Sequence, residues 1–209
     1  MTRYSLDMRY ARSATARLDS KHPGLEIAEG LVRGVTAQNI FGFNRAVGTS
    51  FETVWNNGGT YSFPANPAQL NVVSSSASDT MPVLLVGLND DYDPISETVT
   101  LDGTNAVTTT KEFYRLNNAV ILSGSNVGNI SITDNGTTVG YIEAGLGTTQ
   151  ACVFTVPRNH ALYLFRISLT SGTVKGNRYI TYRNRIDAAN GRVLRVAEAT
   201  WQTGMQTLT

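Results

Sequence analysis

Residues 128–144 read GNISITDNGTTVGYIEA, and this stretch decides the fold class. The segments NISIT and TTVGYIEA, rich in β-branched and aromatic residues, flank an Asn135-Gly136 pair. Asn-Gly takes the two positive-φ positions of a type I′ turn, whose twist matches that of antiparallel strands on either side. The stretch therefore predicts a β-hairpin that turns at residues 134–136.

Similar strand and turn signals extend in both directions from this hairpin. Residues 81–88 (MPVLLVGL) form an apolar run that predicts a central strand, and residues 95–101 (ISETVTL) alternate like a half-buried strand. Residues 51–55 (FETVW) and 60–63 (TYSF) predict a second hairpin around NNGG. Further strands are predicted at residues 70–74, 106–110, 113–122, 152–157, 161–169, 178–186 and 192–196.

The composition favours the same fold class. The chain has 209 residues, of which 16% are charged, well below the roughly 25% of an ordinary soluble domain. Thr, Ser, Asn and Gly take the place of charged residues, and they suit strands, turns and surfaces that a partner covers. We expect an all-β protein with an antiparallel sandwich or jelly-roll-like body at residues 35–209, and an extended or partly helical N-terminal arm at residues 1–34.

The arm is basic and has few apolar residues. Residues 6–18 could form a short helix, but its apolar face is too thin for a core helix. Two interpretations stay open: a solvated tail, or an arm that orders on a partner. At the other end, residues 203–209 are polar, so we expect no closing strand and a sheet edge that a neighbouring subunit could complete.

Charge and cysteine content narrow the function classes. The formal net charge of +1 gives no strong field for nucleic acid or a membrane surface. One cysteine, Cys152, leaves no internal disulfide. No apolar run reaches about 18 residues, and the first residues have no core like that of a signal peptide. We expect a protein made in a cytoplasm, with neither membrane nor nucleic acid as a partner.

Candidate catalytic and metal-binding groups are few and scattered. Residues 89–93 (NDDYD) could hold Ca²⁺ or form a plain turn, and the turn is favoured because Asp and Asn are turn formers. His22 and His160 stand in separate turn-like contexts, and Cys152 is expected to be a buried, inert thiol. Glu97, Glu112 and Glu143 could supply the acid and base of a glycosidase, but the favoured interpretation is that they lie on a solvated face of the strands. We therefore expect no enzyme, no cofactor and no metal site.

Arginine and tyrosine mark the candidate partner-binding positions. These residue types anchor many protein–protein contacts. The late segment mixes them, and with a net charge near zero a protein contact is favoured over plain surface and over nucleic acid. The candidate partner-binding residues are Tyr4, Arg9, Arg12, Arg17, Arg178, Tyr182 and Arg183.

Four strings give the chain a resemblance to a known group. They are VGTSFETVWNNGGTYSFP (47–64), VLLVGLNDDYDPISETVTLDGTNAVTTTKEFYRLN (83–117), GNISIT (128–133) and IEAGLGTTQACVFTVPRNHALYLFRI (142–167). Together they resemble small β-rich virion structural proteins of tailed phages that infect cyanobacteria and other aquatic bacteria. The resemblance implies a structural protein of the virion. It carries over no functional residues.

Within that role, the first hypothesis is a capsid decoration, or cement, subunit that binds the major capsid protein or other virion proteins as a homo-oligomer. The basic arm would clamp across the shell. A tail, baseplate or fibre component is the first alternative. The second is a carbohydrate-binding β-sandwich for host attachment, with Trp55, Tyr61 and Tyr92 as sugar-stacking rings.

Overall fold

The structure is a computed structural model that describes residues 26–27, 29–162, 167–169, 179–187, 193–202 and 206–208. The chain divides into two compact units, Met1–Ile40 and Phe41–Thr209, and each is described by itself. In the first unit, the Leu31 amide closes a turn by donating to the Glu26 carbonyl at 2.8 Å. Residues 1–25 lie outside the described residues, so the arm stays a prediction.

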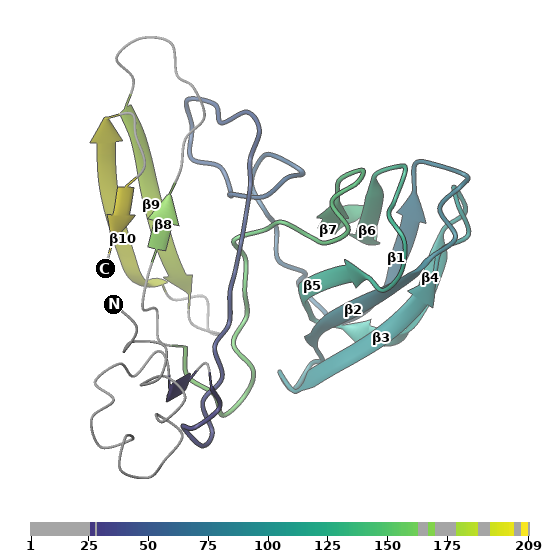
Figure 1. The fold of residues 1–209 in the computed structure, drawn as a ribbon, viewed down its shortest axis with the longest axis horizontal. Coiled ribbons are helices and arrows are strands. Elements are labelled where there is room, and N and C mark those ends of the chain that lie inside the picture. The colour runs from purple at the N-terminus through teal and green to yellow at the C-terminus, as the bar shows by residue number, and fades with distance from the viewer. Residues whose placement is uncertain are drawn as a thin grey trace, which may run out of the picture. The chain divides into compact units, whose positions relative to one another are not determined.

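The second unit is all-β, as predicted, and its body is a two-sheet antiparallel sandwich (Figure 1). One sheet has the order β4-β1-β6-β7 and the other β3-β2-β5. Two further strand pairs are β10-β9 and β11-β8. The strands of the sandwich are β1 Ala68–Ser74, β2 Pro82–Leu88, β3 Pro94–Thr100, β4 Val107–Phe113, β5 Arg115–Ile121, β6 Ile130–Asp134 and β7 Thr137–Ile142. The others are β8 Ile167–Leu169, β9 Tyr179–Asp187, β10 Val193–Gln202 and β11 Gln206–Leu208.

The hairpin predicted from residues 128–144 is confirmed as β6–β7. Asn135 and Gly136 both have positive φ, at 45° and 84°, as a type I′ turn requires. The strands pair from Asp134 opposite Thr137 to Ile130 opposite Ile142. The apolar run at residues 81–88 is also confirmed as a central strand, because β2 lies between β3 and β5.

The core lies between the two sheets. Leu70 and Val72 of β1 face Val83 and Leu85 of β2 across it, and none of these four side chains is more than 1% exposed. They occupy alternate positions along their strands, as a sheet with one buried face demands. Full burial of one such side chain stabilises the fold by roughly 1.5–3 kcal/mol.

Irregular segments cover the free edge of β5. Residues 147–151 run beside it: the Ile121 amide donates to the Gly147 carbonyl at 2.8 Å, and the Thr149 amide to the Ala119 carbonyl at 2.9 Å. The segment around Val54 lies on their other side, where Val54 accepts a hydrogen bond from the Cys152 amide at 2.8 Å. This lateral cover protects the edge from pairing with another chain.

A carboxylate connects the edge strands of the two sheets, β3 and β4, on the other side of the sandwich. Glu97 of β3 accepts hydrogen bonds from the backbone amides of Thr110 (2.7 Å) and Lys111 (2.8 Å) in β4. The Lys111 ammonium group returns a hydrogen bond to the Ser96 carbonyl at 2.7 Å. The amides of Thr110 and Lys111 are therefore satisfied by a side chain instead of by a neighbouring strand.

Three predicted elements are corrected by the structure. Residues 51–63 contain the turn but not the hairpin, because Trp55 bridges to Ala151 and not to residues 60–63. Residues 152–157 form no strand. The Asn117 amide side chain holds that segment instead, with two 2.8 Å hydrogen bonds to the backbone of Thr155. The C-terminal residues do form a strand, β11, which pairs with β8.

Candidate functional site

Two sets of loops, one at each end of the sandwich, gather the unusual side chains. The Asp79 end consists of residues 75–81, 101–106, 122–129 and 143–147, which follow strands β1, β3, β5 and β7. The Tyr92 end consists of Phe63, residues 89–93, the β4–β5 corner at residues 114–115, and Arg158.

A buried carboxylate organises the Asp79 end. Asp79 is 0% exposed, and its oxygens accept hydrogen bonds from the Ser74 hydroxyl (2.5 Å) and the backbone amides of Val127 (2.8 Å) and Gly128 (2.9 Å). Burial opposes the charged carboxylate. The hydroxyl and the two amides outweigh burial, so the pKa of Asp79 lies below its ordinary value. A charged Asp79 therefore ties the 122–129 loop to the start of the 75–81 loop.

A second buried polar residue, Asn126, extends this network. Its side-chain amide donates to the carbonyls of Gly128 (2.7 Å) and Glu143 (2.9 Å), and its oxygen accepts from the Gly147 amide at 3.3 Å. Asn126 is 3% exposed. The network thus fixes the 143–147 loop against the 122–129 loop.

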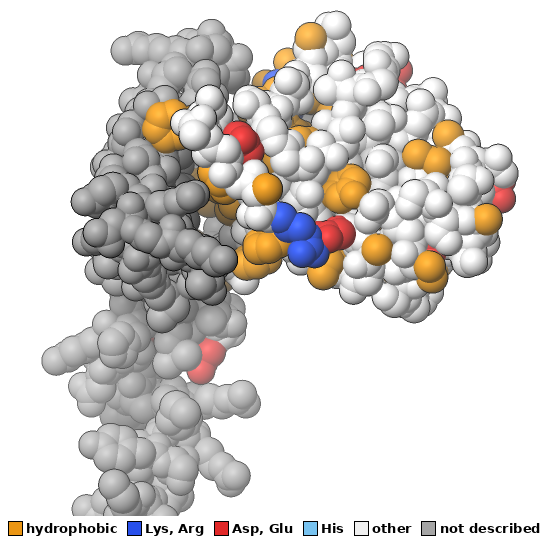
Figure 2. Space-filling model, turned by 90° about the horizontal axis from the view of Figure 1, so that it is seen from above, with side chains coloured by type: hydrophobic (Ala, Val, Ile, Leu, Met, Phe, Trp, Pro, Cys, Tyr) orange, Lys and Arg blue, Asp and Glu red, His pale blue; other side chains and the backbone are white. Residues whose placement is uncertain are grey.

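These fixed loops carry exposed apolar side chains, which we call the apolar tips: Leu122, Val127 and Leu146. Their exposed fractions are 52%, 68% and 38%. Figure 2 looks down on this end of the sandwich and shows hydrophobic side chains scattered over a surface with few charged groups. One ion pair borders it, between Arg45 and Glu143. These exposed apolar side chains, held on fixed loops, are the feature of this end that could contact another protein.

Aromatic rings gather around one guanidinium group at the Tyr92 end. The guanidinium carbon of Arg115 lies 3.7 Å from the Tyr114 ring centroid, 5.2 Å from that of Phe63 and 6.0 Å from that of Tyr92. Arg115 also donates to the Pro64 carbonyl at 2.9 Å. Cation–π contacts of this kind contribute about 0.5–2 kcal/mol each. We call Phe63, Tyr92, Tyr114 and Arg115 the ring cluster.

Tyr92 has an unusual backbone conformation. Its φ is 60°, in the left-handed region that disfavours bulky residues. Hydrogen bonds hold it there, because its amide donates to the Asn89 carbonyl at 3.0 Å and its carbonyl accepts from the Arg158 amide at 2.9 Å. Burial raises the pKa of Tyr92, and Tyr114 adds to that rise through a hydrogen bond and its charge. Arg158 pairs with Asp93 at 2.9 Å beside the ring.

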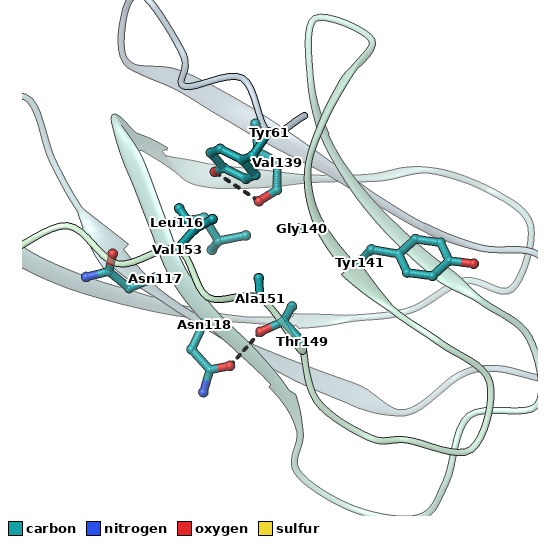
Figure 3. Close-up of a pocket in the computed structure, with 10 residues that line it drawn as sticks. All are labelled: Tyr61, Leu116, Asn117, Asn118, Val139, Gly140, Tyr141, Thr149, Ala151 and Val153. Atoms are coloured by element: carbon teal, nitrogen blue, oxygen red, sulfur yellow. Dashed lines mark hydrogen bonds between the residues drawn. The ribbon is translucent and has the colours of Figure 1, made fainter. Parts of the chain in front are cut away.

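The space between β7 and residues 149–153 is too small for a ligand. Figure 3 shows this cavity, in which Tyr61 points to the carbonyl of Val139 while Tyr141 points away. Its volume is about 10 Å³, which is about the space of one water molecule. The Tyr61 hydroxyl donates to Val139 at 3.2 Å, and burial raises the pKa of Tyr61 to about 12, although Arg115 opposes the rise. This is part of the core and not a binding site.

The predicted partner-binding residues are mostly not placed by the structure. Tyr4, Arg9, Arg12, Arg17 and Arg178 lie outside the described residues. Tyr182 and Arg183 lie in β9, where the backbone register sets them opposite Ala199 and Glu198 of β10. These assignments stay predictions.

The structure shows the surroundings of several other residues that the sequence offered as candidates for catalysis or metal binding. Glu97 bonds backbone amides and Glu143 pairs with Arg45. Residues 89–93 form a turn in which the Asn89 side chain accepts from the Asp93 amide at 2.9 Å. The expectation that Cys152 is buried in a strand is wrong, because the residue is exposed and lies in no strand, but desolvation raises the pKa of its thiol. In the part of the chain that the structure describes, no three His, Cys, Asp or Glu side chains form a group able to hold a metal ion.

The sugar-stacking hypothesis is wrong for two of its three rings. Trp55 and Tyr61 are 3% and 9% exposed and contact each other in the core, with ring centroids 5.1 Å apart. Tyr92 does lie at the surface, together with Phe63 and Tyr114. Sequence reasoning missed the last two, and it also missed Asp79 and Asn126, which stand in polar loops without any burial signal.

Comparison with protein families, with curated proteins and with solved structures finds no match for this chain. Among the described residues, no helix has the length and apolar character needed to cross a membrane. The functional interpretation therefore depends on the geometry of the two ends and on the resemblance of the sequence.

Proposed function

We propose that this chain is a structural protein of a tailed-phage virion, most simply a capsid decoration subunit, that acts by binding other virion proteins. The observation that carries the binding role is the set of apolar tips at the Asp79 end. The phage context comes from the sequence resemblance. A subunit that binds the assembled shell and not its separated parts stabilises the shell by mass action.

The build of the Asp79 end supports a contact role. A loop tip that is already fixed loses little conformational entropy when it binds, so the contact of its apolar side chains yields more affinity. Asp79 and Asn126 fix the loops that carry Val127 and Leu146. Charged side chains are sparse among the residues of these loops, as expected for the centre of an interface.

A pair of matched variants tests the contact role. Val127 and Val47 are 68% and 67% exposed, but only Val127 belongs to the apolar tips. We expect Val127→Lys to weaken cosedimentation of the full chain with particles that lack it by at least tenfold, and Val47→Lys to bind like the wild type. Equal binding by all three proteins would contradict the proposal.

Imaging distinguishes the decoration role from the tail alternative. In a symmetry-resolved reconstruction of the virion, copies spread over the shell surface support a decoration subunit. Copies at a single vertex instead indicate a tail, baseplate or fibre component. The predicted clamp is tested separately: deletion of residues 1–34 should abolish shell binding while the β-body stays folded by circular dichroism. Unchanged shell affinity would contradict the clamp.

A further inference from the structure

We propose that the ring cluster at the Tyr92 end binds a neutral polysaccharide chain on its surface. The inference does not depend on the proposed virion role, which uses the opposite end of the sandwich. It rests on exposed ring surface, on polar groups held beside the rings, on the charge of the site and on the backbone of Tyr92.

The rings offer apolar surface to a ligand. Phe63 is 47% exposed although it contacts Tyr61 edge-to-face, with centroids 5.0 Å apart. Tyr92 and Tyr114 pack edge-to-face beside it, with centroids 5.4 Å apart, and both are partly exposed. The C–H faces of a sugar ring stack on such aromatic surface, and the Tyr hydroxyls supply polar contacts at its rim.

Polar groups that suit sugar hydroxyls stand next to the rings. The Arg158 guanidinium lies 2.9 Å from Asp93 and 4.0 Å from Asp91, and the side chains of these three residues are 51%, 44% and 74% exposed. Carboxylate and guanidinium groups present paired acceptors and donors in one plane. Neighbouring hydroxyls of one sugar unit match such paired groups.

The charge of the site disfavours an anionic ligand. Two cations, Arg115 and Arg158, stand with three carboxylates, those of Asp90, Asp91 and Asp93, so the formal charge is −1. A polyanion such as nucleic acid needs an excess of positive charge. The rings and the charged side chains beside them are at least partly exposed, so an extended chain can lie along them on the surface.

The backbone of Tyr92 supports a binding role for its ring. A left-handed φ of 60° costs roughly 1–2 kcal/mol for a residue with a side chain, and glycine would avoid that cost. Strained conformations of this kind concentrate at ligand-binding sites. At this position the ring is retained despite the strain and is presented beside Phe63 and Tyr114.

Affinity electrophoresis of the full chain tests the proposal. The probes are gels containing dextran, a β-1,3-glucan or a galactomannan, with alginate as the acidic comparison. We expect retardation in at least one neutral gel. Phe63→Ala and Tyr92→Gly should each weaken it by about fivefold to tenfold, the range expected for loss of one aromatic contact. Val47→Ala, which removes an exposed apolar side chain outside the ring cluster, should bind like the wild type.

Several results would overturn the proposal. They are no retardation in any neutral gel, retardation only in alginate that salt removes, and equal retardation of wild type, Phe63→Ala and Tyr92→Gly. Loss of particle binding by the ring variants without any glycan binding would assign this end to a protein partner and also overturn it. Val127→Lys should keep glycan retardation, so failure of the glycan site and failure of the contact role remain distinguishable.

Discussion

At the Asp79 end a fully buried carboxylate receives three directed hydrogen bonds, whereas at the Tyr92 end partly exposed rings surround a guanidinium group. Hydrogen bonds to a buried charge are strong and depend on geometry, so the loss of one partner is costly. Ring contacts are weaker and tolerate small shifts. The first end is therefore built to fix loop conformation, and the second to present side-chain surface.

The largest expected effect is the loss of the buried acceptor. Asp79→Ala leaves the Ser74 hydroxyl and the Val127 and Gly128 amides without their partner. Each unsatisfied buried group costs about 1–3 kcal/mol, and we expect unfolding in urea to show a total loss of roughly 3–5 kcal/mol. The control is Asp102→Ala, an exposed carboxylate bonded to Asn105, which should lose less than about 0.5 kcal/mol. A loss below about 1 kcal/mol in Asp79→Ala would contradict a fixing role.

The same carboxylate predicts a smaller, pH-dependent effect. The pKa of Asp79 is lowered on folding, so it contributes stability above the unfolded-state pKa of about 3.9. That contribution is lost as the pH falls through the lowered folded-state pKa. Urea unfolding from pH 6 to pH 2 should therefore give a smaller loss of stability in Asp79→Asn than in wild type. Parallel curves for the two proteins would show that Asp79 does not supply this dependence.

Gly87 of β2 lies against the backbone of Arg115, so a substitution there tests how closely β2 packs against the start of β5. A Cβ at Gly87 would lie 2.1 Å from the Arg115 carbonyl oxygen and 2.8 Å from the Phe113 ring. Gly87→Ala must therefore move the backbone that carries Arg115, and we expect urea unfolding to show a loss of about 1–3 kcal/mol. Gly48→Ala is the control, because there a Cβ meets only the flexible end of Glu52. Equal stability of both variants would mean that the backbone at Arg115 moves to accept the extra Cβ without loss of stability.

The features predicted correctly from the sequence are those that depend on residues close together in the chain. Asn135-Gly136 specifies its own turn, and the apolar run of β2 identifies a strand flanked on both sides. Contacts between segments far apart in the chain were not predicted. Trp55 pairs with Ala151 instead of with the neighbouring TYSF segment. Asp79 sits in the polar string SSSASD, and it is buried because the 122–129 loop covers it.

The ring cluster was missed for a similar reason. Tyr114 and Arg115 lie where the chain leaves one sheet for the other. The contact of Arg115 with Phe63 requires the segment before β1 to reach that point. The spacing of residues in the sequence does not indicate that these two segments come together. The strand pattern therefore predicted the sandwich, while both functional candidates depend on loops that only the fold brings together.

The smallest expected effect separates the strain at Tyr92 from the contacts of its ring. Tyr92→Ala removes the ring but keeps a Cβ at φ 60°, whereas Tyr92→Gly removes both. Loss of the ring contacts should cost about 0.5–1.5 kcal/mol, and relief of the strain should return roughly 1 kcal/mol. Urea unfolding should therefore place Tyr92→Gly close to wild type and Tyr92→Ala about 1 kcal/mol below it.

Asn159 provides the control for this pair, because its φ is 62° and asparagine tolerates that region. Asn159→Gly should change stability by less than about 0.5 kcal/mol. Equal stability of Tyr92→Gly and Tyr92→Ala would mean that the turn relaxes once the ring is gone, so that the ring itself imposes the left-handed backbone. A difference of about 1 kcal/mol would instead mean that residues 89–93 and Arg158 impose it, and that the ring is held at the surface by the fold.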